Sequence, residues 1–202
     1  KFESKVEIEF IDALLYKMTE NEVINRIVES NADVVAFTVK TMQVEQTLYI
    51  IAEIKKFGSF TIICGGNHVS VEPELFVKNG SNFAIVGEGE TAIAYIIECL
   101  LNNIEISKSI ISNMDIPEDQ LEGSDKLVVI RDELVEEILP NWDIMEIEKY
   151  NENIHYDKGI KALPIMASRG CPYKCDFCSS FLTWGTKVRY RAPELVVYEM
   201  EE

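Results

Sequence analysis

The sequence lacks the features of a membrane, secreted or nucleic-acid-binding protein. Its 202 residues contain 19 lysines and arginines against 35 aspartates and glutamates, a formal net charge of −16. This balance excludes a nucleic-acid binder held by bulk positive charge. No apolar run approaches the roughly 18 residues that a membrane-spanning helix needs. The first ten residues also lack the basic and then apolar layout of a signal peptide. We therefore expect a cytoplasmic protein with neither membrane nor nucleic acid as a partner.

The common phosphate-binding signatures are absent as well. The sequence has no G-x-x-x-x-G-K-[ST] loop and no G-x-G-x-x-G at the start of a helix. The segment Gly87–Glu90 supplies only two glycines, and its carboxylates would repel a pyrophosphate. An ordinary nucleotide is therefore not the expected ligand. What the chain does have is 47% hydrophobic residues, enough for a packed core.

Charge and pattern divide the chain into three zones. Residues 1–103 alternate strand and helix patterns, residues 104–159 carry 15 acidic and 5 basic side chains, and residues 160–202 hold a cysteine cluster. The middle zone is expected to be an acidic linker, with a short strand near 126–132 and Trp142 as a buried packing anchor. The chain starts at Lys1 and stops within a helical pattern, so we expect a fragment of a longer protein.

The first zone predicts an α/β fold. Residues Thr19 and Glu22 form the capping-box pattern at the start of a helix. The repeated alternation predicts a Rossmann-like parallel sheet covered by helices, in which ligands bind beyond the carboxyl ends of the strands. The patterns place strands at residues 6–12, 32–39, 61–66 and 83–89, and helices at 20–30, 41–58, 73–79 and 91–103.

The turns after three of these strands are rich in small and polar residues. Glycines let a large flat ligand approach the backbone, and hydroxyls or amides can fix its polar rim. A single glycine turn is as typical of an ordinary tight turn as of a ligand-binding site. Three such turns on one edge of the sheet favour a ligand-binding site. A lone loop histidine such as His68 is either a metal ligand or, more often, a hydrogen-bonding turn residue. The candidate contacts are Thr38, Thr41, Gln43, Gly65, Gly66, His68, Gly87, Gly89 and Glu90.

Three of the five cysteines lie within eight residues: Cys171, Cys175 and Cys178. In an acidic cytosolic protein this cluster favours metal binding over a disulfide. Three thiolates at these spacings can hold one face of a four-iron cluster and leave one iron open to a substrate or cofactor. Cys64 and Cys99, in a predicted strand and helix, are expected to be buried apolar thiols.

Two other sites compete for the cysteine cluster. A structural zinc site normally needs a fourth ligand, which would have to be His155 or a distant cysteine at unusual spacing. A thioredoxin-like pair formed by Cys175 and Cys178 leaves Cys171 unexplained. Arg169 and Lys174 would offset the charge of a thiolate-rich site.

The segment Ser168–Cys178, SRGCPYKCDFC, resembles the C-x-x-x-C-x-aromatic-C signature of radical S-adenosylmethionine enzymes. The residues after it, Trp184-Gly185 and Arg189–Glu194, resemble the subfamily with an N-terminal cobalamin-binding domain. The first zone is similar to that domain through T-x-x-T-x-Q, GG-x-H-x-S-x-x-P-E and V-G-E-G-E, in the expected order. The Leu-Pro-x-x-Trp-Asp connector also fits. The resemblance covers nearly the whole chain.

The resemblance implies cofactors and roles. Cys171, Cys175 and Cys178 would hold a [4Fe-4S] cluster that binds S-adenosylmethionine, and Phe177 would lie near its adenine. Reductive cleavage would give a 5′-deoxyadenosyl radical that abstracts hydrogen from the substrate. The candidate contacts of the first zone would bind cobalamin, often a methyl carrier in such enzymes. Residues 163–170 would be the first strand of a TIM-type barrel, so that residues 160–202 supply its first βα unit.

The implied reaction is methyl transfer or a related radical rearrangement. The substrate would be an unidentified small molecule or peptide, with electrons from a donor such as flavodoxin or ferredoxin. The chain lacks the D-x-H-x-x-G motif that supplies a cobalt-ligating histidine in many cobalamin proteins, so cobalt ligation by His68 is not supported. Because a barrel needs several more βα units, these residues alone are not expected to be active. The alternative is a non-catalytic module that binds a corrinoid or a partner and carries a structural zinc.

Overall fold

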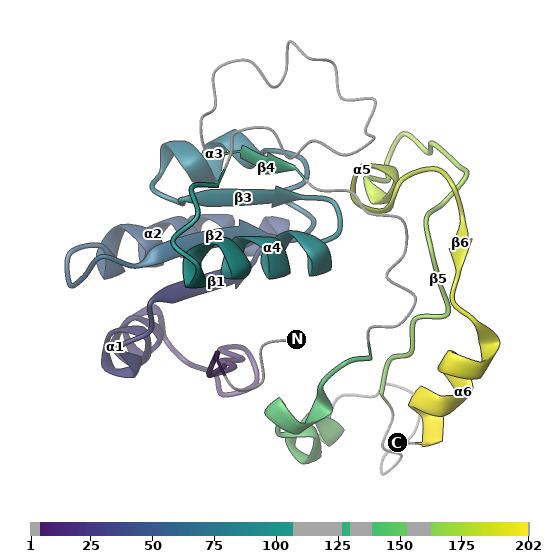
Figure 1. The fold of residues 1–202 in the computed structure, drawn as a ribbon, viewed down its shortest axis with the longest axis horizontal. Coiled ribbons are helices and arrows are strands. Elements are labelled where there is room, and N and C mark those ends of the chain that lie inside the picture. Colours follow the sequence, from purple (N-terminus) through teal and green to yellow (C-terminus); the bar gives the residue numbers. More distant parts are fainter. Residues whose placement is uncertain (1–4, 107–126, 130–138, 153–162, 202) are drawn as a thin grey trace.

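A computed structural model describes residues 5–106, 127–129, 139–152 and 163–201. Its centre is a parallel sheet of four strands in the order β1-β2-β3-β4. Pairing joins Ala36 to Ile63 and Ile85 to Val128 in register. The strands are β1 (Val34–Thr38), β2 (Thr61–Gly65), β3 (Phe83–Val86) and β4 (Leu127–Val129). This confirms the predicted α/β fold with a parallel sheet (Figure 1).

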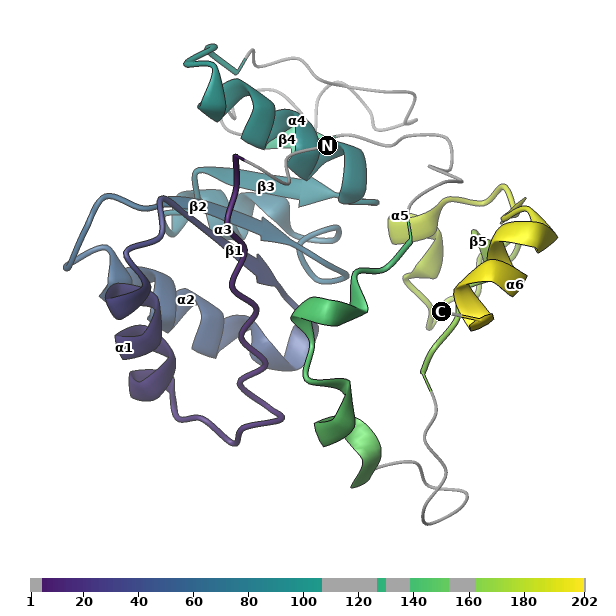
Figure 2. The same ribbon diagram turned by 60° about the horizontal axis from the view of Figure 1, so that its bottom comes forward.

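Helices cover both faces of the sheet, because side chains of a strand alternate between its faces. In β2, Ile62 and Cys64 belong to one apolar cluster and Ile63 to the other. The first cluster packs under α1, α2 and α3, and the second under α4 (Figure 2). The helices are α1 (Glu20–Ser30), α2 (Val44–Ile54), α3 (Pro73–Lys78) and α4 (Glu90–Leu101).

The predicted capping box starts α1. The hydroxyl oxygen of Thr19 accepts a hydrogen bond from the Glu22 backbone N–H (3.4 Å), and the Glu22 carboxylate accepts one from the Thr19 backbone N–H (2.7 Å). These two bonds satisfy N–H groups that the first turn of a helix leaves free. The helix ends at Asn31, whose backbone is left-handed with φ 53°.

Residues 6–12 do not form the predicted strand. They have no regular secondary structure and join no strand ladder among the described residues. Glu9 pairs with Arg26 of α1, so the segment runs beside that helix instead of along the sheet, and Ile8 is 66% exposed. The prediction of a strand here was wrong, because an alternating pattern alone cannot supply the neighbouring strand that a ladder requires.

Several other predicted elements are shorter in the structure, among them one helix and one strand next to the carboxyl edge of the sheet. The helix predicted over 41–58 begins with a 3₁₀ turn at Thr41–Gln43 and ends at Ile54, before Gly58. The strand predicted over 83–89 ends at Val86, since Gly87 has φ 85°. Positive φ at this position turns the chain out of the sheet and into the loop before α4.

The described part of the linker contacts the N-terminal segment. Tyr150 donates a hydrogen bond to the Asp12 carboxylate (2.8 Å), and Lys149 lies over the Tyr16 ring. Trp142, expected to be a buried anchor, is only half-buried. The rest of residues 104–159 lies largely outside the described residues, and the assignment of this zone as a linker stays a prediction.

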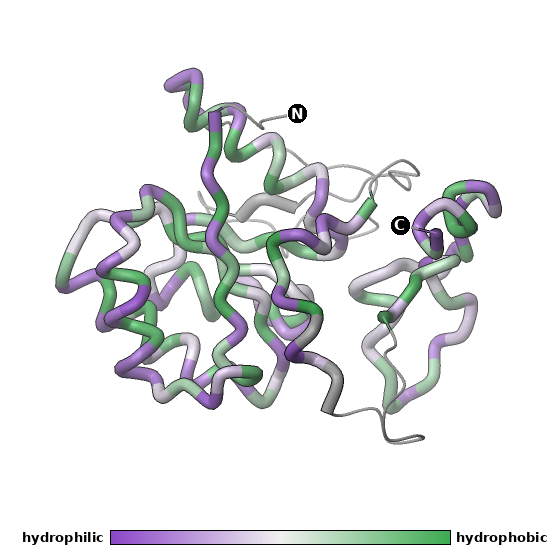
Figure 3. The backbone as a smooth tube through the Cα atoms, turned by 90° about the horizontal axis from the view of Figure 1, so that it is seen from below, coloured by the Kyte–Doolittle hydropathy of each residue, from purple (hydrophilic) through white to green (hydrophobic). Residues whose placement is uncertain are grey.

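The C-terminal arm, residues 163–201, lies beside the sheet domain (Figure 3). It contains β5 (Ser168–Arg169), α5 (Ser180–Trp184), β6 (Arg189–Tyr190) and α6 (Pro193–Glu201). β5 pairs with β6 in antiparallel register, whereas neighbouring barrel strands are parallel. The described residues therefore contain two short antiparallel strands joined by the cysteine loop and α5, which we call the hairpin. The barrel stays a prediction. Within the described parts of the chain, no helix has the length and apolarity to cross a membrane.

Candidate functional site

The loops after β1 and β2 touch each other at the carboxyl edge of the sheet. The Val39 backbone N–H donates to the Gly65 carbonyl (2.8 Å), and the His68 backbone N–H donates to the Val39 carbonyl (3.1 Å). Gly66 between them has φ 101°, and a Cβ there would lie 2.8 Å from the Val39 nitrogen. Glycine is therefore required at this position by both backbone conformation and space.

Ser70 joins the loop after β3 to the loops after β1 and β2. Its hydroxyl donates to the Gly66 carbonyl (3.0 Å) and accepts from the Gly87 backbone N–H (3.0 Å). The residue is buried, and it links the turns after β2 and β3 directly. Ser70 was missing from the candidate contacts, although it occupies the serine position of the GG-x-H-x-S pattern.

His68 uses both ring nitrogens within the protein. Nδ1 lies 3.2 Å from the Thr41 hydroxyl and Nε2 lies 3.1 Å from the Glu72 carboxylate. Its ring edge also packs on Phe76, with the centroids 6.2 Å apart. A histidine held in this way has no free nitrogen for a metal, which supports the interpretation of His68 as a hydrogen-bonding turn residue.

Two of the candidate contacts line one shallow depression of about 410 Å³ beside the sheet edge. These are Thr41 and His68, which lie there with the exposed Met42. The other candidates are not in this depression. Gln43 accepts a hydrogen bond from the Lys40 backbone N–H instead, and Glu90 pairs with an arginine of the C-terminal arm. The depression is lined by Thr41, Met42, Val44, Glu45, Gln46, His68, Glu72 and Leu75.

The three clustered cysteines lie on a loop between β5 and α5. Cys175 is exposed, and Cys171 and Cys178 are partly buried. The loop lines a second depression of about 400 Å³, with Phe177 93% exposed at its side. The hydroxyl and backbone N–H of Ser180 lower the pKa of the Cys178 thiol. Thiols of this kind suit iron–sulfur clusters.

The loop does not hold the three sulfurs together in this conformation. Among the described residues, no three histidines, cysteines or acidic residues form a group that could hold a metal ion. The residue types fit a cluster, but ligation requires the loop to close around it. The start of the loop is fixed, because the Cys171 backbone N–H donates to the Gly185 carbonyl (3.1 Å).

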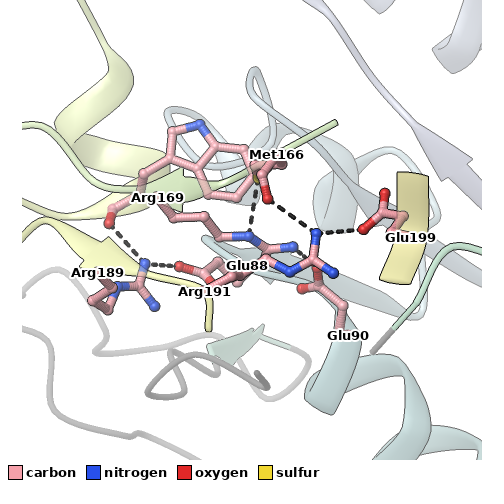
Figure 4. Close-up of polar contacts among 8 residues, drawn as sticks. Glu88, Glu90, Met166, Arg169, Arg189, Arg191 and Glu199 are labelled. Atoms are coloured by element: carbon pink, nitrogen blue, oxygen red, sulfur yellow. Dashed lines mark hydrogen bonds and ion pairs between the residues drawn. The ribbon is translucent and has the colours of Figure 1, made fainter. Parts of the chain in front are cut away.

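A cluster of charged side chains around the buried Glu88 connects this loop to the sheet domain (Figure 4). The Glu88 carboxylate accepts hydrogen bonds from Arg169 Nη1 (2.8 Å) and from Arg189 Nη2. Arg169 Nη2 also donates to Glu90 (2.6 Å), and its guanidinium lies 5.2 Å from the Trp184 ring centroid. We call these five residues the Glu88 cluster.

The Glu88 cluster was not foreseen as a unit. Glu90 was a candidate cobalamin contact, and Arg169 was expected to offset thiolate charge, yet the two pair with each other. Burial alone would raise the pKa of Glu90, but the hydrogen bond and charge of Arg169 hold it below its ordinary value. The sequence signal was a pair of acidic residues in V-G-E-G-E and two arginines beside the cysteines.

We expect the two groups of cysteines to differ in reactivity. Cys64 and Cys99 are buried, as predicted, and burial raises the pKa of Cys64 to about 11. Iodoacetamide at pH 8 under native conditions should alkylate the three loop cysteines and leave Cys64 and Cys99 unmodified, because only an exposed thiolate reacts. Peptide mass mapping checks this, with urea-unfolded protein as the control for full labelling. Native alkylation of Cys64 at the rate of Cys175 would contradict the burial.

Comparison with known proteins gives matches over both the sheet domain and the arm. Residues 3–97 match the B12 binding domain family. The chain is 27% identical over 199 residues to an uncharacterized methyltransferase of Pyrococcus horikoshii, covering 96% of this chain and 41% of the relative. It is 27% identical over 174 residues to bacteriochlorophyllide d C-8(2)-methyltransferase of Chlorobaculum tepidum, covering 86% and 34%.

A third relative is named for a different activity. It is the anaerobic magnesium-protoporphyrin IX monomethyl ester cyclase of Rubrivivax gelatinosus, 29% identical over 200 residues, covering 95% of this chain and 35% of the relative. The chain thus spans less than half the length of these three relatives. No solved structure matches it.

Proposed function

We propose that this chain, whose residues 3–97 match the B12 binding domain family, is part of a cobalamin-dependent radical S-adenosylmethionine enzyme for methyl transfer or a related radical rearrangement. The observation that carries this proposal is the placement of the cysteine loop. Arg169, two residues before Cys171, pairs with Glu88 in the loop after β3 and with Glu90 at the start of α4. The cysteine loop therefore begins two residues after a contact with the edge of the sheet where ligands bind.

Each part of the chain then has a role in the proposed site. The turns after β1, β2 and β3 would receive the corrin, with Gly66 allowing the loops after β1 and β2 to pack closely together. Cys171, Cys175 and Cys178 would hold a [4Fe-4S] cluster, which when bound supplies the electron that splits S-adenosylmethionine into methionine and a 5′-deoxyadenosyl radical. The exposed ring of Phe177 is free to pack against the adenine.

The remaining partners follow from the same proposal. Reduction of the cluster needs an electron donor of the flavodoxin or ferredoxin class. Among the relatives, one methyltransferase is named for a bacteriochlorophyllide and the cyclase for a magnesium protoporphyrin ester. For this chain we propose a small-molecule or peptide substrate, bound by parts of the enzyme beyond the residues described.

Anaerobic reconstitution with iron and sulfide tests the proposal. We expect about four irons per chain, and an electron paramagnetic resonance signal of the reduced cluster that changes when S-adenosylmethionine is added. Cys175→Ala should lose this signal, whereas the matched control Cys99→Ala, a buried cysteine outside the loop, should keep it. Uptake of one zinc in place of iron would overturn the radical chemistry. A chain that takes up iron but no hydroxocobalamin would overturn the corrinoid part.

A further inference from the structure

The Glu88 cluster joins residues far apart in the sequence. Glu88 lies 81 positions before Arg169 and 101 positions before Arg189, so these ion pairs connect the sheet domain to the arm. The Glu88 side chain is only 6% exposed, and those of Arg169 and Arg189 are 20% and 14% exposed. Water therefore screens these charges much less than it screens surface ion pairs.

The hairpin in the arm brings two like charges together. Arg169 and Arg189 occupy directly paired positions of the β5–β6 ladder. Like charges at paired positions of an antiparallel ladder destabilise it. The Glu88 carboxylate bonds one arginine through each of its oxygens, so it offsets this repulsion (Figure 4). Glu88 is thus a carboxylate of the sheet domain that bonds both arginines of the hairpin.

Glu88 itself is held in place by the sheet domain. It follows Gly87, whose backbone N–H donates to the buried Ser70 hydroxyl (3.0 Å). Arg189 also donates to the Trp184 carbonyl (3.1 Å), and Arg169 lies over the Trp184 ring. These contacts extend from the end of β3 to both sides of the cysteine loop, since Arg169 precedes the loop and Trp184 ends the helix after it.

We infer that Glu88 is a positioning residue that docks the cysteine loop against the carboxyl edge of the B12-binding domain through Arg169 and Arg189. The consequence for catalysis rests on the proposed function: docking would set the distance between the cluster and the corrin. The docking itself does not require cofactors, so it can be measured in the cofactor-free chain.

Hydrogen exchange of the cofactor-free chain tests the docking. Glu88→Gln keeps the shape of the side chain but removes its charge, so the two arginines lose the carboxylate that bonds both of them. We expect exchange in peptides covering 165–191 to become at least about tenfold faster, equivalent to roughly 1.4 kcal/mol. Peptides covering β1 and β2 should be unchanged. The matched control is Glu74→Gln, which removes an exposed ion pair with Lys78 and should leave residues 165–191 unchanged.

Tryptophan fluorescence gives a second measurement, which a change in the overall stability of the protein would not alter by itself. In a Trp142→Phe background, Trp184 is the remaining tryptophan, and its emission reports the arginine over its ring. We expect Glu88→Gln to shift this emission, and Glu88→Asp to restore part of the original spectrum.

A double-mutant cycle separates docking from other effects of Glu88. With Arg169 and Arg189 both replaced by Met, Glu88→Gln should have little further effect on exchange, because the pairs it breaks are already gone. Unchanged exchange in Glu88→Gln would overturn the inference, and so would a loss of protection that spreads equally to β2. If docking is confirmed but iron uptake fails, the proposed function is wrong and the docking inference stands.

Discussion

Replacing Gly66 with alanine should lower the free energy of unfolding of the sheet domain by about 3 kcal/mol. Gly66 has φ 101°, a conformation that strains any residue with a Cβ. The new Cβ would also lie 2.8 Å from the nitrogen and 2.9 Å from the oxygen of Val39. Both atoms are backbone and cannot rotate away, so the loops after β1 and β2 would have to separate. Urea unfolding followed by circular dichroism measures the change.

Gly89→Ala is the matched control for this substitution. Gly89 also lies on the predicted corrin edge, but no atom lies within 4 Å of the position of a Cβ there. Its φ of −96° is open to any residue. We expect its replacement to change stability by less than about 1 kcal/mol. Equal losses in the two variants would contradict the assignment of Gly66 as a backbone requirement.

The sequence predicted the sheet domain well because its signals are local. Apolar periodicity, the capping box at Thr19 and Glu22, and turns rich in glycine each act within a few residues. The segment 6–12 was the exception, since strand formation depends on a partner elsewhere in the chain. The length of α2 was overestimated because residues 55–57 continue the helical pattern as turns after the helix has ended.

The candidate site was predicted in its residue types but not in its pairings. Motif spacing identified the cysteines and the turns after β1, β2 and β3 from the sequence. It could not show that Glu88 receives two arginines from about 80 to 100 positions away, because such contacts depend on how the arm folds back. His68 was weighed as a ligand from its residue type alone, and only the contacts with Thr41 and Glu72 show that both ring nitrogens are engaged.

Gly170→Ala should abolish iron uptake during reconstitution while leaving the sheet domain folded. Gly170 has φ 92°, and a Cβ there would clash with the carbonyl oxygen of Lys187. This contact is with the backbone of the opposite side of the hairpin, so β5 and β6 would have to move apart. The hydrogen bond from Cys171 to Gly185 would then be lost, and the start of the cysteine loop would no longer be fixed. Iron content per chain measures the effect.

Ser179→Ala is the control, because Ser179 is exposed in the same region and its side chain makes no cap hydrogen bond to α5. It should take up as much iron as the parent chain. Iron uptake by Gly170→Ala at the parent level would show that the loop can close without the hairpin. Gly170 lies between the docking residue Arg169 and the first proposed ligand Cys171. Glu88→Gln removes the docking but leaves this backbone free to close, so we expect it to retain iron. The two variants thus separate the contact that positions the loop from the backbone turn that shapes it.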